Sequence, residues 1–283
     1  MGKGGQLMNW IQSILYGIVS GIASFLPVSS YGHQVFMRQL FGMTAPDHLT
    51  DLLVHVALLV AVYMGCRKNL KTFGWELGAN KRRRRLGRGQ IERHRIYDVR
   101  LLTTASISTL LVLLLCNGGR KTEQLPLLVC LFFIINGIIL YITDHMRQSN
   151  KDASYMTGLD AVLMGVFSGL RVFPGISGVG GAMSMAIGRG ADRTHGLNWA
   201  LILCIPAFAL LAIFDVVAAA TAVDFVISWA AVGCGILAAF GAFAGGIATI
   251  MLMRFLIVNT GFTGFACYSW GMAILTFILY LIA

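Results

Sequence analysis

Two segments half a chain apart share one pattern, in which an apolar helix is broken at a proline that is followed by serine and glycine. The first is Gly17-Ile-Val-Ser-Gly-Ile-Ala-Ser-Phe-Leu-Pro-Val-Ser-Ser30, and the second is Gly165-Val-Phe-Ser-Gly-Leu-Arg-Val-Phe-Pro-Gly-Ile-Ser177. Internal repeats with broken helices at matching positions are typical of transporters, whose binding site lies where the repeats meet. The sequence therefore predicts one membrane domain over 1–283, built from repeats at about 8–143 and 157–283.

Composition sets the fold class. Hydrophobic residues make up 57% of the chain and charged residues 12%, with a mean hydropathy of +0.75. Soluble domains carry about 25% charged residues, so we expect an all-α integral membrane protein. Apolar runs long enough to cross a hydrocarbon core of about 30 Å predict six transmembrane helices. They cover 49–66, 99–117, 125–143, 196–217, 225–256 and 262–283.

Four shorter apolar pieces occur in two pairs, each split at one of the prolines. The pairs are 8–26 with 34–43, and 157–173 with 181–189. Non-helical backbone at membrane depth must be buried in protein or line a polar cavity. We therefore expect two re-entrant helical hairpins whose tips meet.

The net charge of +10 is concentrated in one segment, because twelve of the 22 Lys and Arg residues lie between Arg67 and Arg100. Basic loops of membrane proteins stay in the cytoplasm, which predicts a cytoplasmic loop over 67–100 and gives the two halves inverted topology. The basic segment lacks the interleaved aromatic residues of a nucleic-acid site. We expect no nucleic-acid partner.

Serines and glycines follow each break. The first turn of a helix offers unpaired N–H groups and the positive end of the helix dipole, which favour a phosphate. This pattern predicts phosphate binding at Ser29, Ser30, Ser177, Gly178 and Gly180, although N-capping alone would also explain the serines. His33 lies one helical turn after Ser30, where it could contact a phosphate, transfer a proton or make a structural hydrogen bond.

Ionisable residues inside membrane spans are costly and often functional. Asp51 and His55 share one helix face, which leaves a mutual hydrogen bond and proton handling as alternatives. Arg171 precedes Pro174 by three residues, so its guanidinium could reach either the second break or the lipid head groups. Arg193 and Asp215 are the remaining candidates.

Several of these segments resemble one bacterial family. They are Phe25-Leu-Pro-Val-Ser-Ser-Tyr-Gly-His33, Asp51-Leu-Leu-Val-His55, Pro174-Gly-Ile-Ser177, and Arg193 ahead of Pro206. Together they are similar to the undecaprenyl-diphosphatase family, also called the bacitracin-resistance protein family, over nearly the whole chain. The resemblance implies an inverted-repeat fold in the bacterial plasma (inner) membrane and a polyprenyl phosphate or pyrophosphate ligand.

The chain departs from that family at its catalytic motifs. The first family motif has two glutamates four residues apart, where this sequence has Ser20 and Ser24. The second reads Pro-Gly-x-Ser-Arg-Ser-Gly, where this sequence has Gly178 and Val179. The family positions that remain are Ser29, Ser30, His33 and Ser177. Each lost electrostatic group typically costs about 100- to 1000-fold in rate, so we expect hydrolysis to be weak or absent.

Three hypotheses follow. The first is a protein that binds undecaprenyl phosphate or pyrophosphate and moves its head group across the membrane. The second is a working diphosphatase with His33 and Ser30 as catalytic groups and Arg171 or Arg193 in place of the lost arginine. The third is a regulatory or partner subunit. No metal site is predicted, and Mg²⁺ or Ca²⁺ would enter only with hydrolysis. The protein partner is unknown, with a homodimer as one option.

Overall fold

A computed structural model describes residues 8–43, 46–85, 93–146, 156–222 and 228–282, without the side chains of 72–85 and 93–98. All regular structure in this described part is helical, which confirms the predicted class. In chain order the elements are α1 (Trp10–Phe25), α2 (Ser30–Leu40), α3 (His48–Arg85), α4 (Arg93–Leu115), η1 (Asn117–Gln124), α5 (Pro126–His145), α6 (Gly158–Gly169), η3 (Leu170–Val172), α7 (Gly178–Gly188), α8 (Arg193–Thr221), α9 (Trp229–Asn259) and α10 (Thr263–Ile282).

The predicted spans correspond to observed helices. By length and composition, α3 up to Lys71, α5, α8, α9 and α10 could each cross a membrane. A sixth span results if Val99–Leu115 of α4 is joined to η1, across a bend of 52°. The described helices thus give five or six spans, in agreement with the six predicted.

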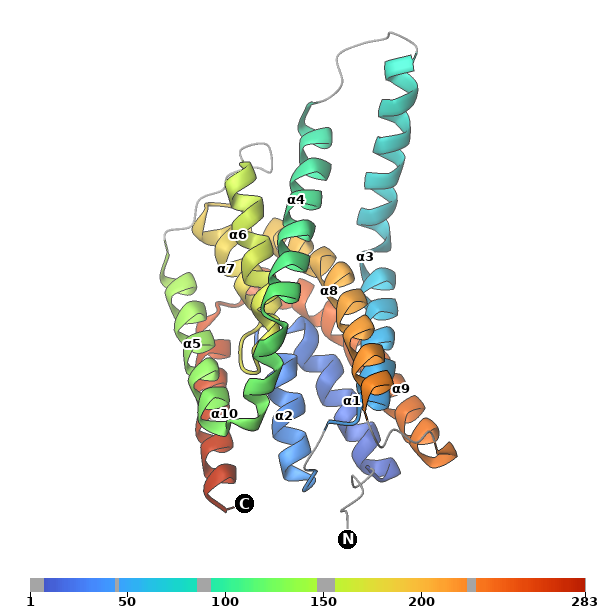
Figure 1. Cartoon of the computed structure of the whole chain (residues 1–283). Helices are drawn as coiled ribbons and strands as arrows, with labels where there is room; N and C mark the ends of the chain where they lie inside the picture. The colour runs from blue at the N-terminus through green and yellow to red at the C-terminus, as the bar shows by residue number, and fades with distance from the viewer. Residues whose placement is uncertain (1–7, 44–45, 86–92, 147–155, 223–227, 283) are drawn as a thin grey trace.

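The basic segment differs from a simple loop. Helix α3 continues to Arg85 and α4 begins at Arg93, so both helices extend well beyond the bundle (Figure 1). Lysine and arginine have good helix propensity, which explains why polar sequence can prolong these helices. The side chains of the arginine run 82–85 lie outside the described residues.

The two hairpins enter the bundle from opposite ends. Figure 1 shows α1 and α2 opening toward the end that holds both chain termini, whereas α6 and α7 open toward the end where α3 and α4 extend. Helix α1 of the first hairpin packs on α9, and α6 of the second packs on α4. In the predicted repeats, α6 corresponds to α1 and α9 corresponds to α4. The α1–α9 and α6–α4 contacts are therefore equivalent, as expected for an inverted repeat. The repeat boundaries at 8–143 and 157–283 remain a prediction.

Glycines allow this close packing in both halves. A Cβ atom at Gly17 would overlap the carbonyl oxygen of Ala238 on α9. A Cβ atom at Gly165, the counterpart of Gly17 in the second repeat, would overlap the carbonyl oxygen of Ala105 on α4. Small residues at such contacts let helix backbones approach each other in membranes. The glycines of the repeated pattern therefore bring each hairpin against the other half of the chain.

Each hairpin breaks at the predicted proline. Leu26 and Phe173, which precede the prolines, are in extended conformation, as sterics before proline favour. After the break, Ser29 has φ 68° and Gly175 has φ 117°. Backbone of this kind cannot continue a helix, so each hairpin has a non-helical tip: residues 26–29 in the first and 173–177 in the second.

Candidate functional site

The two tips contact each other directly. The backbone N–H of Gly175 donates to Ser29 Oγ at 3.0 Å, and Ser177 Oγ donates to the carbonyl oxygen of Leu26 at 3.2 Å. Gly180 lies so near the first tip that a Cβ atom there would be 2.9 Å from Pro27 Cβ. The prediction that the breaks meet is confirmed.

Asn136, on α5, joins the two tips. Its Nδ2 donates to the carbonyl oxygen of Pro27 at 3.1 Å, and its Oδ1 accepts from the backbone N–H of Ser177 at 2.9 Å. The same Nδ2 also donates to Ser269 on α10 at 3.0 Å. One buried amide thus satisfies a carbonyl of the first tip and an N–H of the second, as non-helical backbone at this depth requires.

Ser29 and Ser177 are helix N-caps. Ser29 Oγ accepts from Gly32 N at 3.2 Å in addition to Gly175 N, and Ser177 Oγ accepts from Gly180 N at 3.0 Å. These bonds satisfy N–H groups that would otherwise lack partners at the starts of α2 and α7. Both serines therefore cap helices, which is the alternative that the sequence left open. Both hydroxyls also bond to the opposite tip.

A small polar cavity lies beside the tips. We call it the arginine cavity. Its free volume is about 20 Å³, which is room for about one water molecule. Residues of α2, α3, η1, η3 and α8 line it: Ser30, Tyr31, Gln34, Arg38, Asp51, His55, Arg120, Arg171, Val172 and Leu211. Ser30, the first residue of α2 directly after the first tip, thus lines this cavity.

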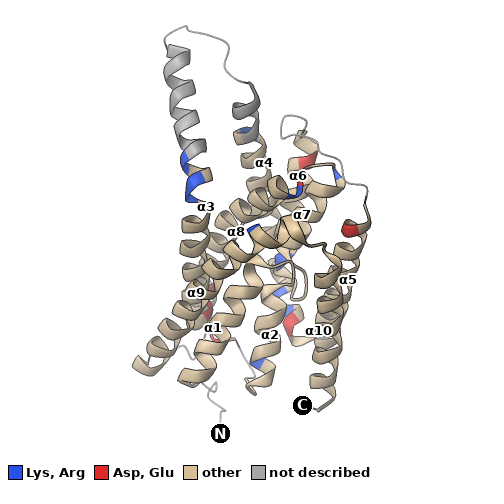
Figure 2. Ribbon diagram, turned by 180° about the vertical axis from the view of Figure 1, so that it is seen from behind, with Lys and Arg blue, Asp and Glu red and all other residues tan. Residues whose placement is uncertain are grey.

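Two arginines of the cavity, Arg38 and Arg120, form ion pairs with carboxylates. Arg38 pairs with Asp51 at 2.5 Å and with Glu123 at 2.8 Å. Tyr16 completes this group, since its hydroxyl donates to Asp51 at 2.6 Å. Figure 2 shows the few charged segments among mostly uncharged helices.

A second ion-pair group surrounds Asp215, whose side chain is fully buried on α8. Arg120 Nη2 and His55 Nδ1 each lie 2.6 Å from one of its carboxylate oxygens. Asp51 and His55, which the sequence placed on one helix face, therefore bond to different partners instead of to each other. The structure links His55 to α8 and η1, and Asp51 to α1 and α2.

Arg171 is different from the other two arginines. Its side chain is buried, with 8% of the residue exposed. Nε donates to the carbonyl oxygen of Ser168 at 3.1 Å, Nη2 donates to Cys204 Sγ at 3.2 Å, and the guanidinium lies over the Phe208 ring at 5.1 Å. No carboxylate pairs with it among the residues that the structure describes. Its guanidinium points into the protein rather than toward lipid head groups.

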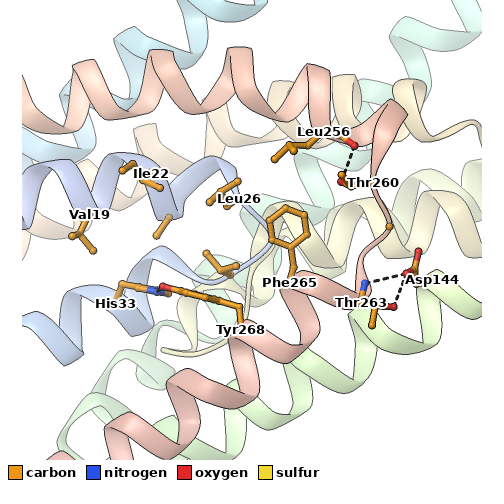
Figure 3. Close-up of a pocket in the computed structure, with 14 residues that line it drawn as sticks. Val19, Ile22, Leu26, His33, Asp144, Leu256, Thr260, Thr263, Phe265 and Tyr268 are labelled. Atoms are coloured by element: carbon orange, nitrogen blue, oxygen red, sulfur yellow. Dashed lines mark hydrogen bonds between the residues drawn. The ribbon is translucent and has the colours of Figure 1, made fainter.

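His33 faces a second, larger hollow. Nδ1 lies 2.6 Å from the carbonyl oxygen of Ser29, and Nε2 lies 2.7 Å from the hydroxyl of Tyr268, on which the imidazole also stacks. Both rings line a mostly apolar groove of about 740 Å³ between α1, α9 and α10 (Figure 3). The structure therefore places His33 and Ser30 on different sides of α2, in different hollows.

Of the remaining predicted residues, Ser20, Ser24 and Val179 lie in the hairpin helices, and Arg193 lies at the start of α8. Ser20 accepts a hydrogen bond of 3.4 Å from Gln34, and Ser24 donates to the carbonyl oxygen of Ser20 at 2.6 Å. Val179 is buried. Arg193 donates to the carbonyl oxygen of Thr260 at 3.0 Å, at the far end of the groove, so the structure does not bring it to the arginine cavity.

Sequence reasoning missed Arg38, Arg120 and Glu123. Arg38 lies within an apolar hairpin piece, so the cost of a charge at membrane depth could have identified it. Arg120 and Glu123 lie in η1, which the sequence assigned to a short polar connection between two spans. No local signal shows that such a connection folds back to contact α2 and α8.

The donor set does not fit a divalent cation. Among the described residues, no group of three or more His, Cys, Asp and Glu side chains is placed to hold a metal ion. The carboxylates of Asp51, Glu123 and Asp215 are each already bound by an arginine of the cavity. A hard cation prefers several such oxygens to itself, so we derive no chemical step through a metal.

Comparisons with known proteins agree with the resemblance to this family. Residues 13–275 match the profile of the family described as bacitracin resistance protein BacA. An undecaprenyl-diphosphatase of Desulfatibacillum aliphaticivorans is 29% identical over 93% of this chain and 96% of its own length. An undecaprenyl-diphosphatase of Treponema denticola is 31% identical over 74% of this chain and 76% of its own. Undecaprenyl-diphosphatase 3 of Bacillus cereus is 26% identical over 96% and 98%.

Proposed function

Because this chain belongs to the bacitracin resistance protein BacA family, we propose that it binds the phosphate end of undecaprenyl phosphate or pyrophosphate and moves it between membrane leaflets. In this proposal hydrolysis is weak or absent. The protein acts in the lipid-carrier cycle of cell-wall synthesis, in the bacterial plasma membrane, with the basic segment 67–100 in the cytoplasm.

One observation carries the proposal: two oppositely entering tips meet in the bundle beside a buried cavity that holds three guanidinium groups. Arginines recognise phosphate through several charge-assisted hydrogen bonds. The neighbouring groove of about 740 Å³ is mostly apolar, and His33 of α2 is among the residues that line it. A polar cavity and an apolar groove on either side of α2 suit a lipid with a phosphate head and an isoprenoid tail.

The side chains near Ser30 support translocation more than hydrolysis. A serine nucleophile needs a base within hydrogen-bond reach. His33 is instead held between the Ser29 carbonyl group and Tyr268, and His55 lies on Asp215. Ser20 and Ser24, where the resemblance expects glutamates, supply no carboxylate. These contacts leave the hydroxyl of Ser30 without an evident activating group.

A working diphosphatase remains the second candidate, because Ser30 shares its cavity with Arg120 and Arg171. Guanidinium groups of this kind can stabilise the charge that develops during phosphoryl transfer. Hydrolysis would then require a base that reaches Ser30 after a rearrangement of the tips.

One reconstitution experiment separates these candidates. Vesicles containing the purified protein are loaded with labelled undecaprenyl phosphate in one leaflet, and parallel samples with undecaprenyl pyrophosphate and Mg²⁺ are assayed for released phosphate. We expect leaflet exchange well above that of protein-free vesicles, slowed by Ser30→Ala, with little phosphate release. Exchange at the protein-free rate would refute translocation. Rapid phosphate release that depends on Ser30 would establish the diphosphatase instead.

A further inference from the structure

Arg171 presents a buried positive charge without a counter-charge. Among the described residues, its guanidinium bonds to a carbonyl oxygen, a thiol and an aromatic face, but to no carboxylate. Isolated charges are costly to bury, and buried ones are normally paired. An arginine held in this way at the wall of a cavity indicates that its natural partner is an anion from outside the chain.

The start of α7 adds a second positive feature. A Cβ atom at Gly178, the first residue of α7, would overlap Arg171 Nε and lie 2.6 Å from Nη2. The guanidinium therefore lies directly against the N-terminal turn of an 11-residue helix, whose dipole is positive at that end. Two positive groups in contact, without a carboxylate, favour an anion more strongly than either does alone.

Arg38 supplies a further unused donor. Its residue is 6% exposed, and its Nε is buried without a hydrogen-bond partner, although its two terminal nitrogens bind Asp51 and Glu123. Buried donors in native proteins usually have partners. Arg38 and Arg171 line the same cavity, so the structure leaves unsatisfied donor capacity on two of its arginines.

The cavity is closed in this conformation. Its volume of about 20 Å³ suits a water molecule and is too small for a phosphate group. Helix η1 contributes Arg120 to the wall of this cavity and has no buried residue of its own. Polar contacts hold η1 in place: Arg120 with Asp215, Glu123 with Arg38, and the Tyr31 hydroxyl with Glu123. Moving η1 would break these polar contacts but would expose no buried apolar side chain of its own, which is typical of segments that open locally.

We propose that Arg171 binds a phosphate dianion in the arginine cavity without a divalent metal ion, after η1 moves aside. The inference deepens the proposed function and rests on it, since it names the group that holds the lipid phosphate. The same chemistry fits the phosphate of undecaprenyl phosphate and free inorganic phosphate. The carboxylates that a metal would need stay paired with arginine and histidine.

The test measures binding in the presence of EDTA. Purified full-length protein in nanodiscs is titrated separately with radiolabelled undecaprenyl phosphate and with inorganic phosphate. We expect saturable binding of the lipid in EDTA, and an affinity about 10- to 100-fold lower for Arg171→Gln, as expected for loss of charge-assisted hydrogen bonds. Arg171→Lys should fall between the two, because it keeps the charge and loses the planar fork.

Arg254→Gln is the matched control, since Arg254 lies exposed on α9 and bonds to the carbonyl oxygen of Gly65. It should bind like the wild type. Thermal stability of each variant shows whether it is folded. Binding that appears only with Mg²⁺, or that survives Arg171→Gln unchanged, would overturn the assignment. If lipid exchange nevertheless occurs at the wild-type rate in that variant, the proposed function stands without this site.

The two ligands identify the source of the phosphate. Binding of both shows that the phosphate group is sufficient, binding of the lipid alone shows that the tail is required, and binding of inorganic phosphate alone contradicts a lipid site. Hydrogen exchange reports on η1: amides of 117–124 should exchange faster when undecaprenyl phosphate is bound. Unchanged exchange there would rule out the movement of η1.

Discussion

Asp215→Ala is expected to destabilise the protein by about 3–5 kcal/mol, because it leaves the Arg120 guanidinium and the His55 imidazole without their shared, fully buried carboxylate. Asp215 is fully buried and accepts from Arg120 and His55, each at 2.6 Å. Arg120 would keep its charge, so its desolvation would no longer be offset. The measurement is the free energy of unfolding in detergent, monitored by denaturant titration.

Asp192→Ala on the same helix is the control. Asp192 is exposed and caps α8 through the N–H groups of Thr194 and His195, so its loss should cost about 1 kcal/mol. Adding Arg120→Met to Asp215→Ala should recover part of the stability, because the unpaired cation is removed. Equal costs for Asp215→Ala and Asp192→Ala would show that the ion-pair group around Asp215 is not formed.

Gly17→Ala is also expected to destabilise the protein, because the added methyl group would clash with α9. The added methyl group would overlap the carbonyl oxygen of Ala238, which belongs to the α9 backbone and cannot rotate away. Helices α1 and α9 would have to separate, and overpacking of this kind typically costs about 1–3 kcal/mol, with larger values for contacts to backbone. Because α1 carries the first tip, lipid exchange should fall as well.

Gly271→Ala provides the matched comparison, since Gly271 also lies inside a helix and a Cβ atom there meets nothing within 4 Å. Alanine has the better helix propensity, so this variant should be neutral or more stable by about 0.5–1 kcal/mol. Unfolding of both variants is followed by the same denaturant titration. A Gly17→Ala protein as stable as Gly271→Ala would contradict the close packing of α1 on α9.

The architecture could be predicted from sequence because its signals are local. Pro27 and Pro174 are each followed by serines and glycines, a local pattern that indicates a break, whereas Pro206 is followed by apolar residues and lies inside α8. Repetition of that pattern then indicated that the breaks meet. The observed bonds between Ser29 and Gly175, and between Ser177 and Leu26, confirm this.

The electrostatics of the site could not be predicted in the same way. Arg38, Arg120 and Arg171 come from three separate elements, and only the tertiary fold brings them to one cavity. The sequence left three roles open for His33: phosphate contact, proton transfer or a structural hydrogen bond. In the structure both ring nitrogens are hydrogen-bonded, to the Ser29 carbonyl group and to Tyr268, and the imidazole lines the groove.

The phosphate site can be located from a structure of the protein with undecaprenyl phosphate bound, because the phosphorus atom is identified there. We expect phosphorus in the arginine cavity, with phosphate oxygens within hydrogen-bond distance of Arg171 and Ser30 and with η1 displaced. Phosphorus on the outer surface of the bundle, with the cavity closed and the tips still in contact, would contradict this expectation.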